Sequence, residues 1–220
     1  MTRKRKNVLP ESDVECIELE DRREWRLGGK LHRTDGPARI WADGSREWCY
    51  YGNYHRTDGP AIDKVTGYKC WYHHGRVHRE DGPSVILPDG QLNWFFYDKL
   101  HRADGPAITY PSGYAAWWSM GKRHRADGPA LIHEDGKKEW WSSGKRHRLD
   151  GPAIEHSDGS KEWWIQGIQH RDDGPAVMWA DSTNWWFING DKLWFDEWCE
   201  KLDKSPNEIL MLVIKYNITL

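Results

Sequence analysis

The chain has 220 residues, enough for one or two globular domains, yet it holds 16 tryptophans and only 4 phenylalanines, a skew that an ordinary core does not produce. Its 32 basic and 34 acidic residues give a formal charge of -2 at pH 7, which excludes a net field attracting nucleic acid or anionic membranes. The longest apolar run, residues 209–214, is far too short to span a bilayer. We therefore expect neither nucleic acid nor a membrane as the main partner.

The four cysteines stand alone in the sequence, with no CxxC and no paired spacing: Cys16, Cys49, Cys70 and Cys199. This spacing indicates neither a disulfide framework nor a zinc knuckle. Isolated thiols suit a reducing compartment, and we predict a cytoplasmic protein.

Residues 1–13 begin the chain with a basic run, and we predict a flexible basic tail there. Residues 14–190 are built from a 23-residue unit in which His-Arg-x-Asp-Gly-Pro-Ala recurs without insertion. Trp25 lies one period before the seven repeat tryptophans, so the N-terminal stretch of this array is a degenerate zeroth copy with Cys16 and Ile17 near its first strand position. The repeat tryptophans are Trp48, Trp71, Trp94, Trp117, Trp140, Trp163 and Trp186.

Each unit carries two short apolar or aromatic runs separated by turn residues, as at 130–132, 134–136 and 139–141, which predicts a β-hairpin per repeat. Two strands and two connections within one unit leave no room for the crossover that parallel pairing needs. The predicted fold is all-β, a single-layer antiparallel meander of hairpin repeats that forms an elongated rod. The apolar position after the repeat Ala is expected to share a face with the repeat Trp, and the aromatic position after that Trp should lie on the other face.

Residues 191–220 change to helical spacing, and Ser205-Pro206-Asn207-Glu208 is typical of a helix start with a capping box. We predict a short α-helical C-terminal cap that covers the open edge of the last repeat. A partner-docking helix is the alternative interpretation.

The unit resembles the MORN repeat, which has the same length and combines a Trp, a Gly-Lys-x-His segment and an Asp-Gly. The segments 118–124 and 141–147 and the pair Asp135-Gly136 carry that combination. The His-Arg-x-Asp-Gly-Pro turn replaces the family's shorter His-Gly-x-Gly and is similar to MORN-related repeats of bacterial, phage and large-virus proteins. The resemblance covers residues 14–190 and implies a single-layered hairpin array used for scaffolding, protein contact and sometimes lipid contact.

The His-Arg-x-Asp strings resemble a kinase catalytic loop, but no glycine-rich nucleotide loop or strand lysine accompanies them, and catalysis has no use for seven copies. We predict that the chain is not an enzyme and needs no cofactor. Instead, each Asp is expected to accept turn amide hydrogen bonds while His or Arg pairs with a nearby carboxylate. This structural turn ladder comprises His32, Asp35, His55, Asp58, His78, Asp81, His101, Asp104, His124, Asp127, His147, Asp150, His170 and Asp173.

No metal site is expected either. Zinc ligands must lie within roughly 4 Å of one another, whereas equivalent columns of neighbouring repeats lie about 10 Å apart. One repeat therefore offers a single His and a single Asp, and the off-column His73, His74, His133 and His156 do not complete a set.

A one-layer sheet cannot bury both faces against itself, and a large exposed aromatic area usually marks an interface. We predict a non-enzymatic scaffold or inhibitor that binds a protein partner, for instance a phage factor acting on a host protein; a homodimer would bury the same stripe. The alternatives are a nucleic-acid-binding repeat protein that uses Arg and Trp, and carbohydrate stacking on Trp. The predicted partner-binding residues are Tyr72, Phe95, Trp118, Trp141, Trp164 and Tyr97, with the variable positions Tyr51, His74 and Met120 beside them.

Overall fold

The computed structural model describes residues 11–218, so most of the predicted basic tail lies outside the described residues. Where that tail is described, Glu11–Asp13 form a short 3-10 helix, η1. The chain divides into two compact units. Unit 1 runs to Arg102 and includes Ala107–Pro111, and unit 2 consists of Ala103–Pro106 and the chain from Ser112 onward.

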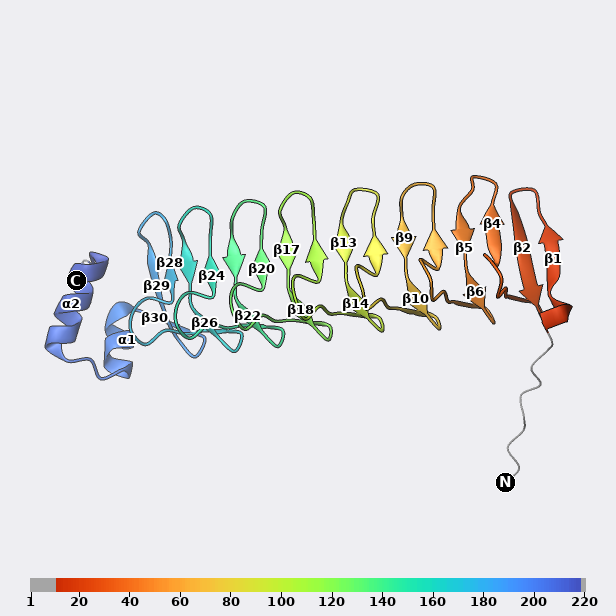
Figure 1. The fold of residues 1–220 in the computed structure, drawn as a ribbon. Coiled ribbons are helices and arrows are strands. Elements are labelled where there is room, and N and C mark those ends of the chain that lie inside the picture. Colours follow the sequence, from red (N-terminus) through yellow and green to blue (C-terminus); the bar gives the residue numbers. More distant parts are fainter. Residues whose placement is uncertain (1–10, 219–220) are drawn as a thin grey trace, which may run out of the picture. The chain divides into compact units, whose positions relative to one another are not determined.

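Unit 1 is an antiparallel meander of main-sheet strands with a second set of short hairpins attached to it (Figure 1). The main sheet pairs the strands in the order β1, β2, β4, β5, β8, β9, β12, β13 and β16, and the second hairpins are β2–β3, β6–β7, β10–β11 and β14–β15. The strands are β1 (Glu15–Glu18), β2 (Arg22–Leu27), β3 (Lys30–Leu31), β4 (Arg39–Trp41), β5 (Arg46–Glu47), β6 (Cys49–Tyr50), β7 (Asn53–Tyr54), β8 (Ile62–Asp63), β9 (Lys69–Cys70), β10 (Tyr72–His73), β11 (Arg76–Val77), β12 (Val85–Ile86), β13 (Leu92–Asn93), β14 (Phe95–Phe96), β15 (Lys99–Leu100) and β16 (Ile108–Thr109).

Unit 2 repeats this plan and ends in two helices. Its main sheet runs through β17, β20, β21, β24, β25, β28 and β29, and its second hairpins are β18–β19, β22–β23, β26–β27 and β29–β30. The elements are β17 (Ala115–Ala116), β18 (Trp118–Ser119), β19 (Lys122–Arg123), β20 (Leu131–Ile132), β21 (Lys138–Glu139), β22 (Trp141–Ser142), β23 (Lys145–Arg146), β24 (Ile154–Glu155), β25 (Lys161–Glu162), β26 (Trp164–Ile165), β27 (Ile168–Gln169), β28 (Val177–Met178), β29 (Asn184–Ile188), β30 (Asp191–Leu193), α1 (Phe195–Lys201) and α2 (Pro206–Tyr216).

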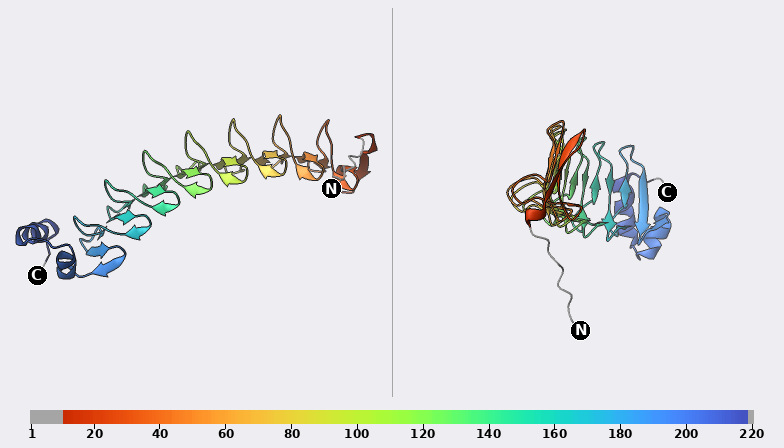
Figure 2. Two further views of the ribbon diagram at one scale, coloured as in Figure 1. Left: turned by 90° about the horizontal axis from the view of Figure 1, so that it is seen from below. Right: turned by 90° about the vertical axis from the view of Figure 1, so that its right-hand side faces the viewer.

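The predicted hairpin meander with a helical cap is confirmed, and the structure adds a second hairpin to each repeat. These second hairpins turn out of the plane of the main-sheet strands (Figure 2). Their tips carry two successive residues with positive φ, such as Ser143 at 51° and Gly144 at 86°. Two positive φ values in a two-residue loop define a type I′ turn, whose twist matches that of the flanking strands. The Gly-Lys-x-His segment is therefore the returning half of a tight hairpin.

The core of each unit differs from the predicted division of faces. Ile62 lies opposite Cys70 in the main sheet, and these two residues form a buried cluster with Val85. Tyr72 and Phe95 pack against that cluster. The aromatic position after the repeat Trp therefore shares the core with the apolar column. The register places Ile62 opposite Cys70, one residue before the repeat Trp71, and alternation from Cys70 puts Tyr72 on the same face.

The two helices cover the last repeat of unit 2, as the cap interpretation predicted. Trp186, Ile188, Trp198 and Cys199 form a buried cluster, and partly buried residues of α2 pack against it. Helix α2 begins at the predicted capping box, in which the Ser205 amide donates to the Glu208 carboxylate at 2.9 Å. The last repeat extends slightly further than expected, since residues 191–193 form β30 rather than part of the cap.

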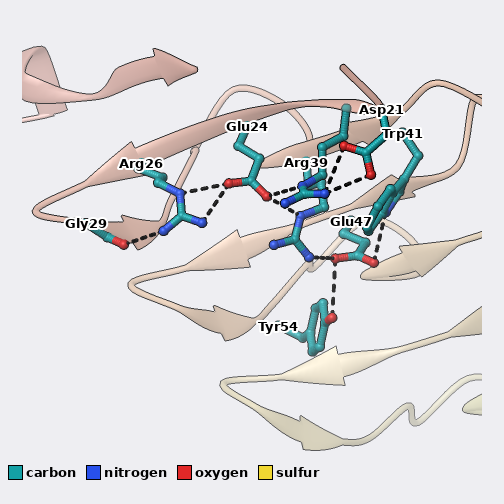
Figure 3. Close-up of polar contacts among 9 residues, drawn as sticks. Asp21, Glu24, Arg26, Gly29, Arg39, Trp41, Glu47 and Tyr54 are labelled. Carbon is teal, nitrogen blue, oxygen red and sulfur yellow. Dashed lines mark hydrogen bonds and ion pairs between the residues drawn. The ribbon is translucent and has the colours of Figure 1, made fainter. Parts of the chain in front are cut away.

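The first repeats of unit 1 have a charged core (Figure 3), whereas the cluster of Ile62, Cys70 and Val85 that follows is apolar. Arg39 occupies the apolar column, and its guanidinium donates to Glu24 at 2.8 Å and to Glu47 at 2.9 Å. Both carboxylates are buried, with exposed fractions of 1% and 6%. Arg22 and Arg26 complete the pairing of Glu24, each at 2.8 Å. The departure of Arg39 from the apolar pattern thus reflects two buried carboxylates that need a cation.

Neither of the two described α-helices combines the length and the apolar character that crossing a membrane requires.

Candidate functional site

The arginine of each His-Arg-x-Asp-Gly-Pro element stacks on the tryptophan eight residues before it. The Cζ atom lies between 3.8 and 4.2 Å from the ring centroid in all seven repeats. This is close range for a cation–π contact. The pairs are Arg33–Trp25, Arg56–Trp48, Arg79–Trp71, Arg102–Trp94, Arg125–Trp117, Arg148–Trp140 and Arg171–Trp163.

The rest of the element holds that arginine in place. In one repeat of unit 2, Arg148 Nε donates to Asp150 Oδ1 at 3.0 Å and Nη1 donates to the carbonyl of Pro152 at 3.2 Å. The hydrogen bond from Arg148 lowers the pKa of Asp150 below its usual range. A Cβ atom on Gly151 would lie 2.9 Å from the Arg148 Cζ atom, so glycine is needed for the close approach. The element therefore forms a clamp around one guanidinium. The aspartate accepts a hydrogen bond from the arginine side chain, whereas the sequence predicted that it would accept hydrogen bonds from turn amides.

The same Arg–Asp hydrogen bond recurs at 2.6–3.0 Å between Arg33, Arg56, Arg79, Arg125, Arg148 and Arg171 and the aspartates Asp35, Asp58, Asp81, Asp127, Asp150 and Asp173.

Replacing Arg148 by lysine is expected to lower the free energy of unfolding of unit 2 by about 1–3 kcal/mol, although the charge is kept. Lysine has no planar fork to stack on Trp140 while donating to two acceptors. Hydrogen exchange of the segments around residue 148 measures this loss. Asp150→Asn is the control: the Asp150 side chain is exposed, so little change is expected there. Equal effects of the two variants would contradict the clamp.

The repeat histidines contribute to the second hairpins. The Nδ1 atom of five of them accepts a hydrogen bond from the amide of the residue 19 positions later, at the hairpin tip, over 3.1–3.3 Å. His78 instead lies with Nε2 3.5 Å from the Glu80 carboxylate. The histidines therefore position the hairpin tips, while arginine pairs with the aspartate. The five histidines are His32, His55, His124, His147 and His170.

The predicted partner-binding stripe is half-buried rather than exposed. Tyr72 and Phe95 pack on the core of unit 1. In unit 2, Trp118, Trp141 and Trp164 alternate with arginines of the second hairpins, since Arg123 lies 5.3 Å from the Trp118 ring and 5.1 Å from the Trp141 ring. Arg146 continues the series, 5.2 Å from the Trp141 ring and 5.3 Å from the Trp164 ring. These residues hold neighbouring repeats together.

A different set of rings forms a continuous row along the second hairpins of unit 1. Ring centroids in contact are 4.0–6.3 Å apart, within or near the range of favourable aromatic pairs. Tyr50 and Phe96 are exposed large hydrophobic residues within it. This aromatic row consists of His32, Tyr50, Tyr51, His55, His73, His74, His78, Phe96, Tyr97 and His101.

Unit 2 builds the same hairpins without these rings. The hairpin positions that carry Tyr50-Tyr51, His73-His74 and Phe96-Tyr97 in unit 1 carry Ser142-Ser143 and Ile165-Gln166 in unit 2. The turn geometry is nevertheless the same, with φ of 47° at His74 and 51° at Ser143. The rings of the aromatic row are therefore not required for the hairpin fold.

Two clefts lie beside the aromatic row, between successive His-Arg-x-Asp-Gly-Pro loops of unit 1. The first has a volume of about 520 Å³ and is lined by Trp48, Tyr50 and His55 among others. The second has a volume of about 670 Å³, and Tyr97 is among its lining residues. Aromatic rings form part of the wall of each cleft, and the arginines and aspartates of the adjoining loops form much of the rest.

Sequence reasoning identified Tyr97 and the positions Tyr51 and His74 but missed Tyr50, His73 and Phe96. The signal was present in the sequence, since these three residues stand two positions after the repeat Trp and are aromatic only in the first half of the array. This signal was missed because the prediction used the column directly after the Trp, which is aromatic in more of the repeats.

No family model matches the sequence, and no curated protein matches it. The MORN resemblance therefore stays a prediction.

Proposed function

We propose that the chain is a non-enzymatic protein-binding repeat protein, a scaffold or inhibitor, and that the aromatic row of unit 1 is its contact surface. The observation that carries the proposal is the contrast between the two units. Unit 2 makes the same hairpins with Ser, Gln and Ile where unit 1 has rings, so the rings serve something other than folding. Tyrosine is among the residues most enriched at binding hot spots.

The spacing of the repeats favours an extended partner segment. Two main-sheet strands per repeat advance the clefts by about 10 Å. Three residues of an extended or polyproline II chain cover nearly the same distance, at about 3.1–3.3 Å per residue. A partner segment with an apolar residue at every third position would place one side chain in each cleft. Aromatic-lined grooves bind such segments because little chain entropy is lost.

Nucleic acid is the weaker alternative. In six repeats the clamp arginine donates to an aspartate, and in all seven it stacks on a tryptophan. An arginine held in this way has its charge offset locally and is not presented to phosphates. We also propose a cytoplasmic location, because the four cysteines are free.

The test replaces the rings by the residues that unit 2 carries. The variant Tyr50→Ser/Tyr51→Ser/Phe96→Ser/Tyr97→Ser should keep the β-sheet circular dichroism of the natural protein. It should weaken partner binding at least about 30-fold, which is the effect of removing one or more hot-spot residues. A randomised peptide library identifies the ligand class. Peptides selected by the natural protein should carry apolar residues three positions apart and should not be retained by the variant.

The control variant, Met120→Ser/Ile168→Ser, removes two exposed apolar side chains of unit 2 and should select the same peptides as the natural protein. Equal peptide retention by the ring variant would contradict the aromatic row as the contact surface. Recovery of nucleic acid from cell extract only at low salt would favour the alternative.

A further inference from the structure

Three histidines of unit 1 meet at one point of the aromatic row. His55 belongs to the repeat element, His73 ends β10, and His74 is at the tip of the β10–β11 hairpin. One ring nitrogen of each lies within 4.8 Å of the other two. The His55 and His74 rings are stacked at 4.1 Å, and the His73 ring centroid is 5.3 Å from that of His55.

Within the part of the chain that the structure describes, such a histidine cluster occurs in one repeat. The equivalents of His73 and His74 are Tyr50 and Tyr51 in the preceding repeat. They are Phe96 and Tyr97 in the following one. Equivalent positions of different repeats provide no such set, but the β10–β11 hairpin folds back and brings two off-column histidines onto a repeat histidine.

The cluster is suited to a metal ion that prefers nitrogen ligands. In the adjoining loops, Asp58 and Asp81 are paired with Arg56 and Arg79, and the Glu80 carboxylate lies 3.5 Å from His78 Nε2. An all-imidazole set selects Zn²⁺, Cu²⁺ or Ni²⁺ over Mg²⁺ and Ca²⁺.

Binding requires a small adjustment. Nitrogens on one zinc ion lie within about 4 Å of each other, so rotation of the exposed His74 ring must close the remaining distance. His55 Nδ1 accepts a hydrogen bond from the His74 amide at 3.3 Å. Coordination through either ring nitrogen of His55 removes that bond, because Nδ1 either holds the metal or carries the proton. One hydrogen bond is a minor loss beside three metal bonds.

We propose that His55, His73 and His74 form a site for a divalent transition-metal ion, Zn²⁺ first among them. Three protein nitrogens leave at least one coordination position for water or for an anionic group of a bound partner. The proposal does not rest on the proposed peptide-binding function, because metal binding is measured on the isolated chain.

Calorimetric titration of the full chain with Zn²⁺ at pH 7.5 should show one zinc ion bound per chain. The site should retain this ion in competition with a chelator of moderate affinity. The variant His73→Phe/His74→Tyr, which copies the pair of the following repeat and so keeps the hairpin's packing, should lose this equivalent. Single variants His73→Gln and His74→Gln should each bind at least about tenfold more weakly, since losing a group that only orients a ligand already costs that much. His133→Gln, in unit 2, should leave zinc binding unchanged.

A transplant tests whether the hairpin geometry builds the site. The amide of Ser143 donates to His124 Nδ1 at 3.3 Å, as that of His74 does to His55. Ser142→His/Ser143→His in the natural background should therefore add a second equivalent of Zn²⁺. Zinc binding that survives His73→Phe/His74→Tyr, or a transplant that binds none, would overturn the proposal.

Discussion

Replacing Arg39 by methionine is expected to lower the free energy of unfolding of unit 1 by about 3–5 kcal/mol, the usual cost of leaving buried charge without its partner. The Arg39 guanidinium bridges Glu24 and Glu47, both buried. Glu24 keeps Arg22 and Arg26 after the change, whereas Glu47 is left with the neutral donors Trp41 Nε1 and Tyr54 Oη. Hydrogen exchange of β4 and β5 in the natural and variant proteins measures the loss.

Two further variants separate the buried charge from a general sensitivity to lost arginines. Arg23→Ala removes an arginine whose ion pair with Glu18 is exposed, and a change below about 1 kcal/mol is expected. Arg39→Ile/Glu47→Cys copies the pairing of Ile62 with Cys70 in the next repeat. Because replacing a buried ion pair by packed apolar groups is often neutral, this double variant should regain most of the stability. A double variant no more stable than Arg39→Met would refute this account.

The fold was predictable because the 23-residue spacing is uninterrupted and each repeat carries its own turn residues. What the sequence did not reveal is the register, which places Ile62 opposite Cys70 and not opposite the repeat Trp71. Alternation then puts Tyr72, two residues after Cys70, on the same face as Cys70 and Ile62. Tyr72 therefore packs with Ile62 and Cys70, against the predicted division of faces.

The candidate site was only partly predictable for a related reason. The Arg–Asp pairing joins residues only two positions apart, and every copy of the repeat contains both residue types, so this pairing was predictable. The histidine cluster depends on the reversal between His73 and Val77, which brings residues 18 and 19 positions from His55 back to it. A comparison of equivalent positions in different repeats does not detect contacts between non-equivalent positions.

The buried carboxylates also make stability depend on pH, with the largest change in acid. Burial by itself would raise the pKa of Glu139, but hydrogen bonds from Lys137 and His133 and the charge of Arg146 outweigh it and hold the pKa at about 2, against an ordinary value of 4.5. In Glu24, burial is likewise outweighed by Arg22, Arg26 and Arg39, and the pKa is again about 2. The charged form is therefore favoured in the folded state.

A folded-state pKa below the unfolded value stabilises the protein above the unfolded pKa, and this stabilisation is lost as the pH falls through the folded pKa. Each carboxylate should therefore contribute fully above about pH 5 and lose about 3 kcal/mol between pH 4.5 and 2, at roughly 1.4 kcal/mol per pKa unit. Because the two carboxylates lie in different units, hydrogen exchange as a function of pH resolves them. Glu139→Gln should destabilise unit 2 at neutral pH and flatten its acid dependence, while unit 1 keeps the dependence that Glu24 imposes. An unchanged acid profile of unit 2 in that variant would show that Glu139 does not control it.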